Sequence, residues 1–292
     1  METKKLKIMK LNTIKTVGRS DFVNMGPIEL RQPIPTQKIE MVDPFILLHH
    51  YGPYKIDEKN NPFDLGPHPH RGFEPITFLI KGEQLHRDSL GNESVVKAGD
   101  VQWTTAGRGI IHAEKPTKEF VKKGGDLEGI QLWLNLPAKD KMITPAYQHI
   151  KSDEMPVIKD PSENIKLKVV AGEQKGKYGK IKTQTSVNVF MIEANGKGEL
   201  EIEIPTTHES CIYLLNGEAK INDEKVLSKG ELQMAVFNTD GNTIKLEITE
   251  NSKLIVISGE PIKEKVAQYG PYVMNTQTEL LEAMRDYQDG KM

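Results

Sequence analysis

The same order of short apolar segments and glycine turns occurs twice in this chain. The segment 78–83 (FLIKGE) resembles 213–218 (YLLNGE), with an offset of 217 − 82 = 135 between the two glycines. The segment 96–102 (VKAGDVQ) resembles 227–233 (LSKGELQ), with an offset of 230 − 99 = 131. Such a duplication predicts two related domains in tandem, and a shorter hairpin in the second copy explains the smaller offset. We expect the link near 137–156 and place the domains at residues 1–136 and 137–292.

Between its glycines and prolines the chain consists of short segments rich in β-branched and aromatic residues. The candidate strands are 75–80, 93–97, 129–134, 165–170, 187–193, 199–204, 211–215 and 243–249. Short strands with this punctuation favour an all-β sandwich or barrel. The carboxyl end differs, because Thr276 and Glu279 have capping-box spacing and apolar residues follow at helical intervals up to Tyr287. We predict an all-β protein that ends in a short helix, with Gly290 as its stop.

Charge and cysteine content exclude several classes of function. The chain has 39 basic and 41 acidic residues, a net charge of −2, which gives no electrostatic basis for direct nucleic-acid binding. No segment approaches the roughly 18–20 apolar residues of a membrane span, and residues 1–10 carry charge without a signal-peptide core. The single cysteine, Cys211, cannot form an intramolecular disulfide. We expect a cytoplasmic protein with no nucleic-acid or membrane partner.

Two pairs of metal-binding side chains occur at alternate positions in the first copy. His68 and His70 lie in the segment 66–74 (GPHPHRGFE), and His112 and Glu114 follow a glycine-rich run. Alternate residues of a strand point to the same face, so each pair presents two donors side by side. Three imidazoles and a carboxylate suit iron, copper, nickel or zinc better than calcium or magnesium. We predict that these four residues hold one divalent transition-metal ion.

The second copy lacks an equivalent set of ligands. A shift of 135 moves His68 and His70 onto Glu203 and Pro205, and His208 is the only histidine nearby. A lone histidine is more often a hydrogen-bonded structural residue than a ligand. We therefore expect the second domain to bind no metal.

Five blocks of the chain together resemble the pirin family, whose members are two-domain cupins. The blocks are 43–48 (DPFILL), 68–74 (HPHRGFE), 99–114 (GDVQWTTAGRGIIHAE), 131–137 (QLWLNLP) and 269–275 (YGPYVMN). The resemblance covers nearly the whole chain and implies two tandem cupin-type antiparallel β-barrels or sandwiches. It assigns the metal to His68, His70, His112 and Glu114. Iron is the metal usually implied, and copper, nickel, cobalt, manganese or zinc could also occupy this donor set.

Three other features near these motifs need an interpretation. Glu74 completes the first-motif spacing of cupins, and three roles stay open for it: a further ligand on the face of His70, a partner that orients an imidazole, or a structural residue. His49 and His50 stand where related sequences often carry an acidic residue. They point to opposite faces of a strand, and we interpret both as structural. The polar connection 51–67 is expected to form a lid or rim loop.

The resemblance implies two kinds of function. Similar proteins are dioxygenases of the quercetinase type, in which a flavonol binds the metal through its 3-hydroxyl oxygen. Dioxygen then attacks the enolate carbon, and the ring opens with release of carbon monoxide. Glu114 would be both ligand and general base, and the partners would be a small aromatic substrate and O2.

The alternative is a metal-dependent regulator that binds a transcription factor or a metabolic enzyme as its protein partner. A purely structural zinc site is disfavoured, because three histidines among glycines resemble an open site more than a closed, cysteine-rich one.

Overall fold

The computed structural model describes residues 9–231 and 233–292. Most of the charged amino terminus (1–8) and Leu232 of the second repeat lie outside the described residues. Unit 1 of the chain comprises residues 1–19, 156–179 and 187–260, and unit 2 comprises 20–155, 180–186 and 261–292. These compact units differ from a single division at residue 137, because each copy is completed by a segment from the opposite end of the chain. The division at 137 itself stays a prediction.

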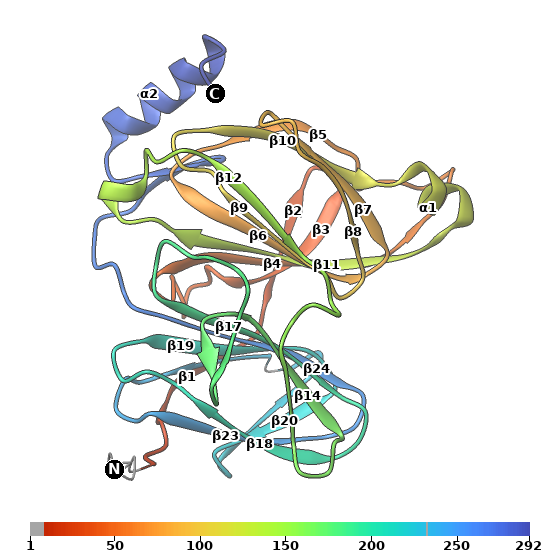
Figure 1. Cartoon of the computed structure of the whole chain (residues 1–292), viewed down its shortest axis with the longest axis vertical. Helices are drawn as coiled ribbons and strands as arrows, with labels where there is room; N and C mark the ends of the chain where they lie inside the picture. The colour runs from red at the N-terminus through yellow and green to blue at the C-terminus, as the bar shows by residue number, and fades with distance from the viewer. Residues whose placement is uncertain (1–8, 232) are drawn as a thin grey trace. The chain divides into compact units, whose positions relative to one another are not determined.

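Unit 2 contains the first copy of the repeat as two antiparallel sheets (Figure 1). The larger sheet consists of β2 (Asp21–Met25), β3 (Ile28–Ile34), β4 (Phe45–Ile56), β6 (Phe73–Lys81), β9 (Val101–Thr105), β11 (Gly125–Asn135) and β12 (Ala146–Ile150). The smaller sheet consists of β5 (Leu65–His70), β7 (Glu83–Asp88), β8 (Glu93–Lys97) and β10 (Ile110–Pro116). The strand orders are β12-β9-β6-β11-β4-β3-β2 and β5-β10-β7-β8.

Unit 1 contains the second copy with an equivalent pair of sheets. Its larger sheet consists of β1 (Ile14–Gly18), β13 (Val157–Lys159), β14 (Ile165–Ala171), β17 (Val187–Ala194), β19 (Glu209–Asn216), β22 (Met234–Phe237) and β24 (Ser252–Gly259). Its smaller sheet consists of β18 (Gly198–Glu203), β20 (Glu218–Ile221), β21 (Lys225–Ser228) and β23 (Thr243–Ile248). The orders β1-β22-β19-β24-β17-β14-β13 and β18-β23-β20-β21 repeat those of unit 2 position by position. The all-β, two-barrel prediction is therefore confirmed.

The repeated glycines make the same tight turn in both copies. Gly82 joins β6 to β7 with φ +87°, and Gly217 joins β19 to β20 with φ +81°. A Cβ atom would lie 2.8 Å from the Asp126 carbonyl oxygen at Gly82 and 2.1 Å from Ser252 Oγ at Gly217. Only glycine adopts this backbone conformation at such close approach without strain, which explains why the two sequences agree here.

The remaining elements are short, apart from the helix at the carboxyl end. They are β15 (Glu173–Gln174), β16 (Lys177–Tyr178), β25 (Ala267–Tyr269), β26 (Tyr272–Met274), α1 (Lys118–Lys123), the 3₁₀ turn η1 (Ala138–Asp140) and α2 (Gln277–Gln288). Thr276 and Glu279 form the predicted capping box at the start of α2, and Gly290 follows it with φ +67°. No helix among the described residues has the length and apolar character needed to span a membrane.

Candidate metal centre

The inner face of the smaller sheet in unit 2 carries a row of polar side chains across three strands. On β10, His112 is paired with His68 of β5 on one side and with Asp88 of β7 on the other. Two residues further along β10, Glu114 is opposite His86 of β7. Directly opposite residues of an antiparallel pair have Cβ atoms about 4.5–5.5 Å apart. The register of the sheet therefore brings these donors together.

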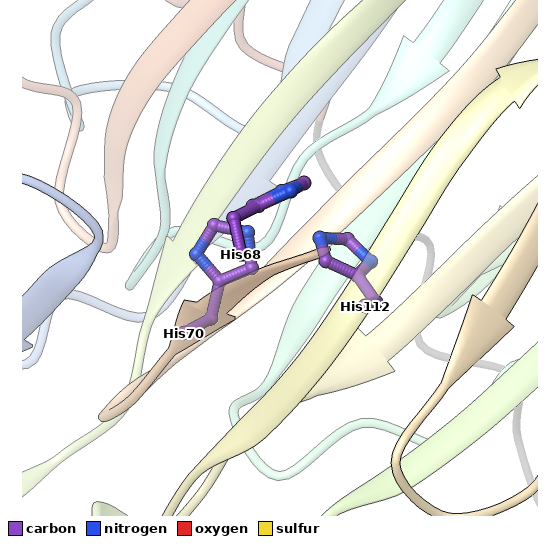
Figure 2. Close-up of side chains that lie close together, drawn as sticks. All are labelled: His68, His70 and His112. Carbon is purple, nitrogen blue, oxygen red and sulfur yellow. The ribbon is translucent and has the colours of Figure 1, made fainter. Parts of the chain in front are cut away.

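Three imidazoles of the predicted ligand set lie against one another in Figure 2. The ring centroids of His112 lie 4.4 Å from His68 and 4.8 Å from His70, and those of His68 and His70 are 5.0 Å apart. One ring nitrogen from each residue lies within 4.8 Å of the other two. Donors bonded to one ion at about 2 Å are at most about 4 Å apart, so a small adjustment of the rings would let these three side chains share a metal.

Glu114 belongs to a second group of donors that overlaps the first. His86, His112 and Glu114 also offer ligand atoms within 4.8 Å of one another, and His112 is common to both groups. Gln102 Nε2 and Thr77 Oγ1 donate hydrogen bonds to Glu114 Oε1, the latter over 3.3 Å. The four predicted residues thus gather around His112, but in two overlapping groups. Their binding of a metal stays a prediction.

His70 and His112 are neutral, and each keeps at least one ring nitrogen that has no hydrogen-bond partner within the described residues. Burial, together with the neighbouring imidazoles, lowers the pKa of His70 to about 3 and that of His112 well below its usual value. His70 Nδ1 and both ring nitrogens of His112 have no hydrogen-bond partner within the described parts of the chain. Unpartnered buried polar atoms cost about 1–3 kcal/mol each. Neutral imidazole is the form that binds metals, so this donor set fits a transition-metal ion.

Glu74 lies on the opposite face of β6 from the site. Thr77 donates to Glu114, and Glu74 is three positions earlier, an odd number that reverses the side of the strand. Its Oε1 accepts a hydrogen bond of 2.5 Å from Thr105 Oγ1. The expectation that Glu74 shares the face of His70 is wrong, because a turn at Gly72, with φ +85°, separates β5 from β6 and restarts the alternation. The structural role is the one the geometry supports.

His49 and His50 of β4 have different surroundings, as the prediction of opposite faces requires. His50 has no contact with the cavity described below, whereas His49 lines it. His50 is buried and contacts Glu128 Oε1 at 3.1 Å. His49 pairs with Gln32 Oε1 at 2.8 Å. The predicted rim loop is shorter than 51–67, because β4 continues to Ile56 and β5 begins at Leu65.

A cavity of about 360 Å³ opens onto His68, His70 and Glu114. Its walls are mainly aliphatic and aromatic, and Trp133 forms one of them. The Trp133 ring lies 4.2 Å from that of Phe73 and 5.7 Å from that of His70. The volume is within the range of small-molecule sites. No lysine or arginine occurs among the described residues that line it, so the cavity suits a neutral, largely apolar ligand.

Several residues near the donors were missed by the sequence reasoning. His86 and Asp88 lie at alternate positions on β7, and Gln102 and Tyr147 approach from the larger sheet. The i, i+2 spacing of His86 and Asp88 predicts that their side chains share one face of a strand. Its place beside Glu114 depends on the register between β7 and β10, which no local spacing reveals.

Known proteins resemble this chain along most of its length. Residues 28–134 match the family model described as Pirin, and residues 189–292 match that of the Pirin C-terminal cupin domain. Pirin of Rattus norvegicus is 33% identical over 282 residues, covering 96% of this chain and 92% of the relative. A pirin-like protein of Solanum lycopersicum is 32% identical over 278 residues, covering 95% and 91%. The crystal structure of a quercetin 2,3-dioxygenase from Acinetobacter baumannii superposes with a TM-score of 0.89 at 31% identity, covering 97% of this chain and 98% of that one.

Proposed function

The chain belongs to the pirin family, and we propose that it is a metal-dependent dioxygenase that cleaves a flavonol or a similar enolisable aromatic with O2. The observation that carries this proposal is the apolar cavity that opens onto two of the clustered imidazoles and Glu114. The structural likeness to a protein named quercetin 2,3-dioxygenase supports it. A cytoplasmic location is part of the proposal, in keeping with a single, buried cysteine.

His68, His70, His112 and Glu114 would hold the ion, with iron as the first candidate. Copper, nickel, cobalt, manganese and zinc also accept imidazole and carboxylate donors. When bound, such an ion supplies a Lewis acid that favours the deprotonated form of a substrate hydroxyl.

Glu114 would accept the proton of that hydroxyl. Gln102 could present either its amide nitrogen or its amide oxygen, and the carboxylate oxygen of Glu114, which accepts hydrogen bonds, selects the nitrogen, while Gln102 Oε1 accepts from Tyr147 over 3.3 Å. The amide nitrogen of Gln102 therefore faces Glu114 Oε1, where Thr77 also donates. These two donors hold the carboxylate in place beside the cavity, as a general base requires.

The cavity walls would orient a planar substrate. Trp133, supported by the ring of Phe73, offers a flat aromatic surface next to His70. Burial lowers the pKa of His49 to about 4, so this wall residue is neutral near pH 7. A neutral flavonol can enter without leaving a buried charge unpaired, which would be costly.

Quercetin turnover tests the proposal directly. The metal-free protein is loaded in turn with ferrous iron and the other candidate ions, then mixed with quercetin in air. Loss of the flavonol's visible absorbance with release of carbon monoxide is the expected result for at least one metal. His70→Ala should lose the turnover and bind the metal more weakly, whereas His208→Ala in unit 1 should change neither. Full turnover by metal-free protein would contradict the proposal, and inactivity under every metal would favour the regulatory alternative.

A further inference from the structure

The His86–Asp88 pair on β7 is buried beside the predicted ligands without being one of them. His86 Nε2 and Asp88 Oδ2 are 3.0 Å apart, and the two side chains are 1% and 0% exposed. Asp88 is itself held in place, because Asn92 Nδ2 and the backbone N–H groups of Leu90 and Asn92 donate to its carboxylate over 2.9–3.1 Å. The carboxylate therefore has one fixed orientation toward the imidazole.

The orientation of the His86 ring leaves one nitrogen facing away from Asp88. The ring stacks on Tyr147 with centroids 4.2 Å apart and an interplanar angle of 12°, and its centroid lies 5.4 Å from that of His112. Asp88 accepts a hydrogen bond from Nε2, so in the neutral tautomer of the ring the lone pair lies on Nδ1. Nδ1 is buried and has no hydrogen-bond partner among the residues described.

A carboxylate behind an imidazole is the arrangement that orients histidine ligands in metal sites. His68 has only the Gly66 carbonyl oxygen in this position, 2.8 Å from its Nδ1. Of the clustered imidazoles in the described chain, His86 is the one for which a hydrogen bond to a carboxylate is found. One of its ring nitrogens also lies within 4.8 Å of a ligand atom of His112 and of Glu114.

We propose that His86 is a further metal ligand, and that the barrel binds one ion at either of two overlapping positions that share His112 and Glu114. The outer position is the site proposed above, formed by His68, His70, His112 and Glu114, and the inner one is formed by His86, His112 and Glu114. The inner set of two imidazoles and one carboxylate is the donor combination of non-haem iron(II) sites. This inference rests on the metal centre proposed above but not on flavonol turnover.

Removing the outer position isolates the inner one. The double variant His68→Ala/His70→Ala is titrated with Co²⁺ alone, and binding is followed by the visible d–d absorption and by calorimetry. We expect one Co²⁺ per chain to be retained, with weaker affinity and an altered spectrum. Adding His86→Ala to the double variant should abolish binding. Adding Asp88→Asn instead should weaken it about 10- to 100-fold, as for other partners that orient a ligand.

His149→Ala is the matched control, because His149 also pairs with a carboxylate, Asp100 at 3.1 Å, yet belongs to neither donor group. In the double-variant background it should leave Co²⁺ binding unchanged, and circular dichroism verifies that each variant is folded. A folded double variant that binds no Co²⁺, or binding that survives the triple substitution, would overturn the proposal. Failure of wild-type protein to consume quercetin would refute the proposed function without affecting this result.

Discussion

The two barrels have the same strand order, and they differ in what lines the space between their sheets. On the smaller sheet of unit 2 the inward positions are occupied by polar residues, including His86, His112 and Glu114. On the equivalent sheet of unit 1, Ile202 and Leu246 belong to a continuous apolar core that also receives side chains from the larger sheet. One backbone plan therefore supports either a site or a filled core.

This difference has an energetic reason. Burying an aliphatic side chain contributes about 1.5–3 kcal/mol, whereas a buried polar group contributes only if its partners are present. Unit 1 obtains its stability from packing between both sheets. In unit 2, a cavity and a set of polar donors occupy part of the space between the sheets. Its apolar cluster of Ile28, Leu30, Tyr51 and their neighbours lies beside them.

The largest expected effect is a difference in metal content between a variant of the first barrel and a variant of the second. His112→Ala removes the one donor common to both groups, and we expect it to leave no stoichiometric metal after purification. His208, a buried histidine of unit 1 that contacts Ser258 Oγ at 3.2 Å, provides the control. Elemental analysis of His208→Ala should match the wild-type protein. Equal metal loss in both variants would mean that the site is not confined to the first barrel.

A cavity in the filled core should destabilise unit 1 by about 3–5 kcal/mol. Phe190 is fully buried in that core, and Phe190→Ala leaves its neighbours without contact atoms. Both tryptophans, Trp103 and Trp133, belong to unit 2. In urea, the far-ultraviolet circular dichroism should therefore show an earlier transition while tryptophan fluorescence keeps its midpoint. Identical shifts in both signals would show that the two units unfold as one.

The smallest effect concerns the buried carboxyl group of unit 2. Burial raises the pKa of Glu74 from 4.5 to about 7, an effect that the hydrogen bond from Thr105 partly opposes. Between these values the folded state keeps a proton that the unfolded state has lost, so stability falls as pH rises from about 4.5 to 7, by up to about 3 kcal/mol.

Glu74→Gln should remove this part of the pH dependence, measured as the urea midpoint of metal-free protein from pH 5 to 8. Thr105→Ser keeps the hydroxyl that donates to Glu74 and serves as the control. A slope that is unchanged in Glu74→Gln would mean that Glu74 is ionised in the folded protein throughout this range.

Local sequence patterns were sufficient for the fold and for several of the donor side chains that the structure brings together. Glycines such as Gly82 and Gly217 recur because the turn geometry requires them, so the repeat was visible without any tertiary information. The capping box at Thr276 and Glu279 depends on four consecutive residues and was predictable for the same reason. The i, i+2 spacing of His68 and His70 predicted neighbouring imidazoles because β5 continues through both residues.

Alternation does not predict which face a side chain occupies once a turn interrupts the strand. It also does not predict which residues lie opposite each other on neighbouring strands. Glu74 was assigned to the wrong face because the turn at Gly72 resets the count. His86 was missed because its distance from Glu114 is set by strand pairing rather than by spacing along the chain. The place of β1 in the second copy also depends on distant residues, since β1 pairs with β22 far along the sequence.

The sequence by itself therefore determined the all-β duplication, the family and the two donor pairs, because each depends on short-range geometry or on a specific motif. Only the tertiary structure decided that Glu74 faces away from the donors, that His86 and Asp88 lie beside Glu114, and that a cavity opens onto His68 and His70. These features arise from strand register and from the packing of one sheet on another. Both are set by contacts between residues that are distant in the chain.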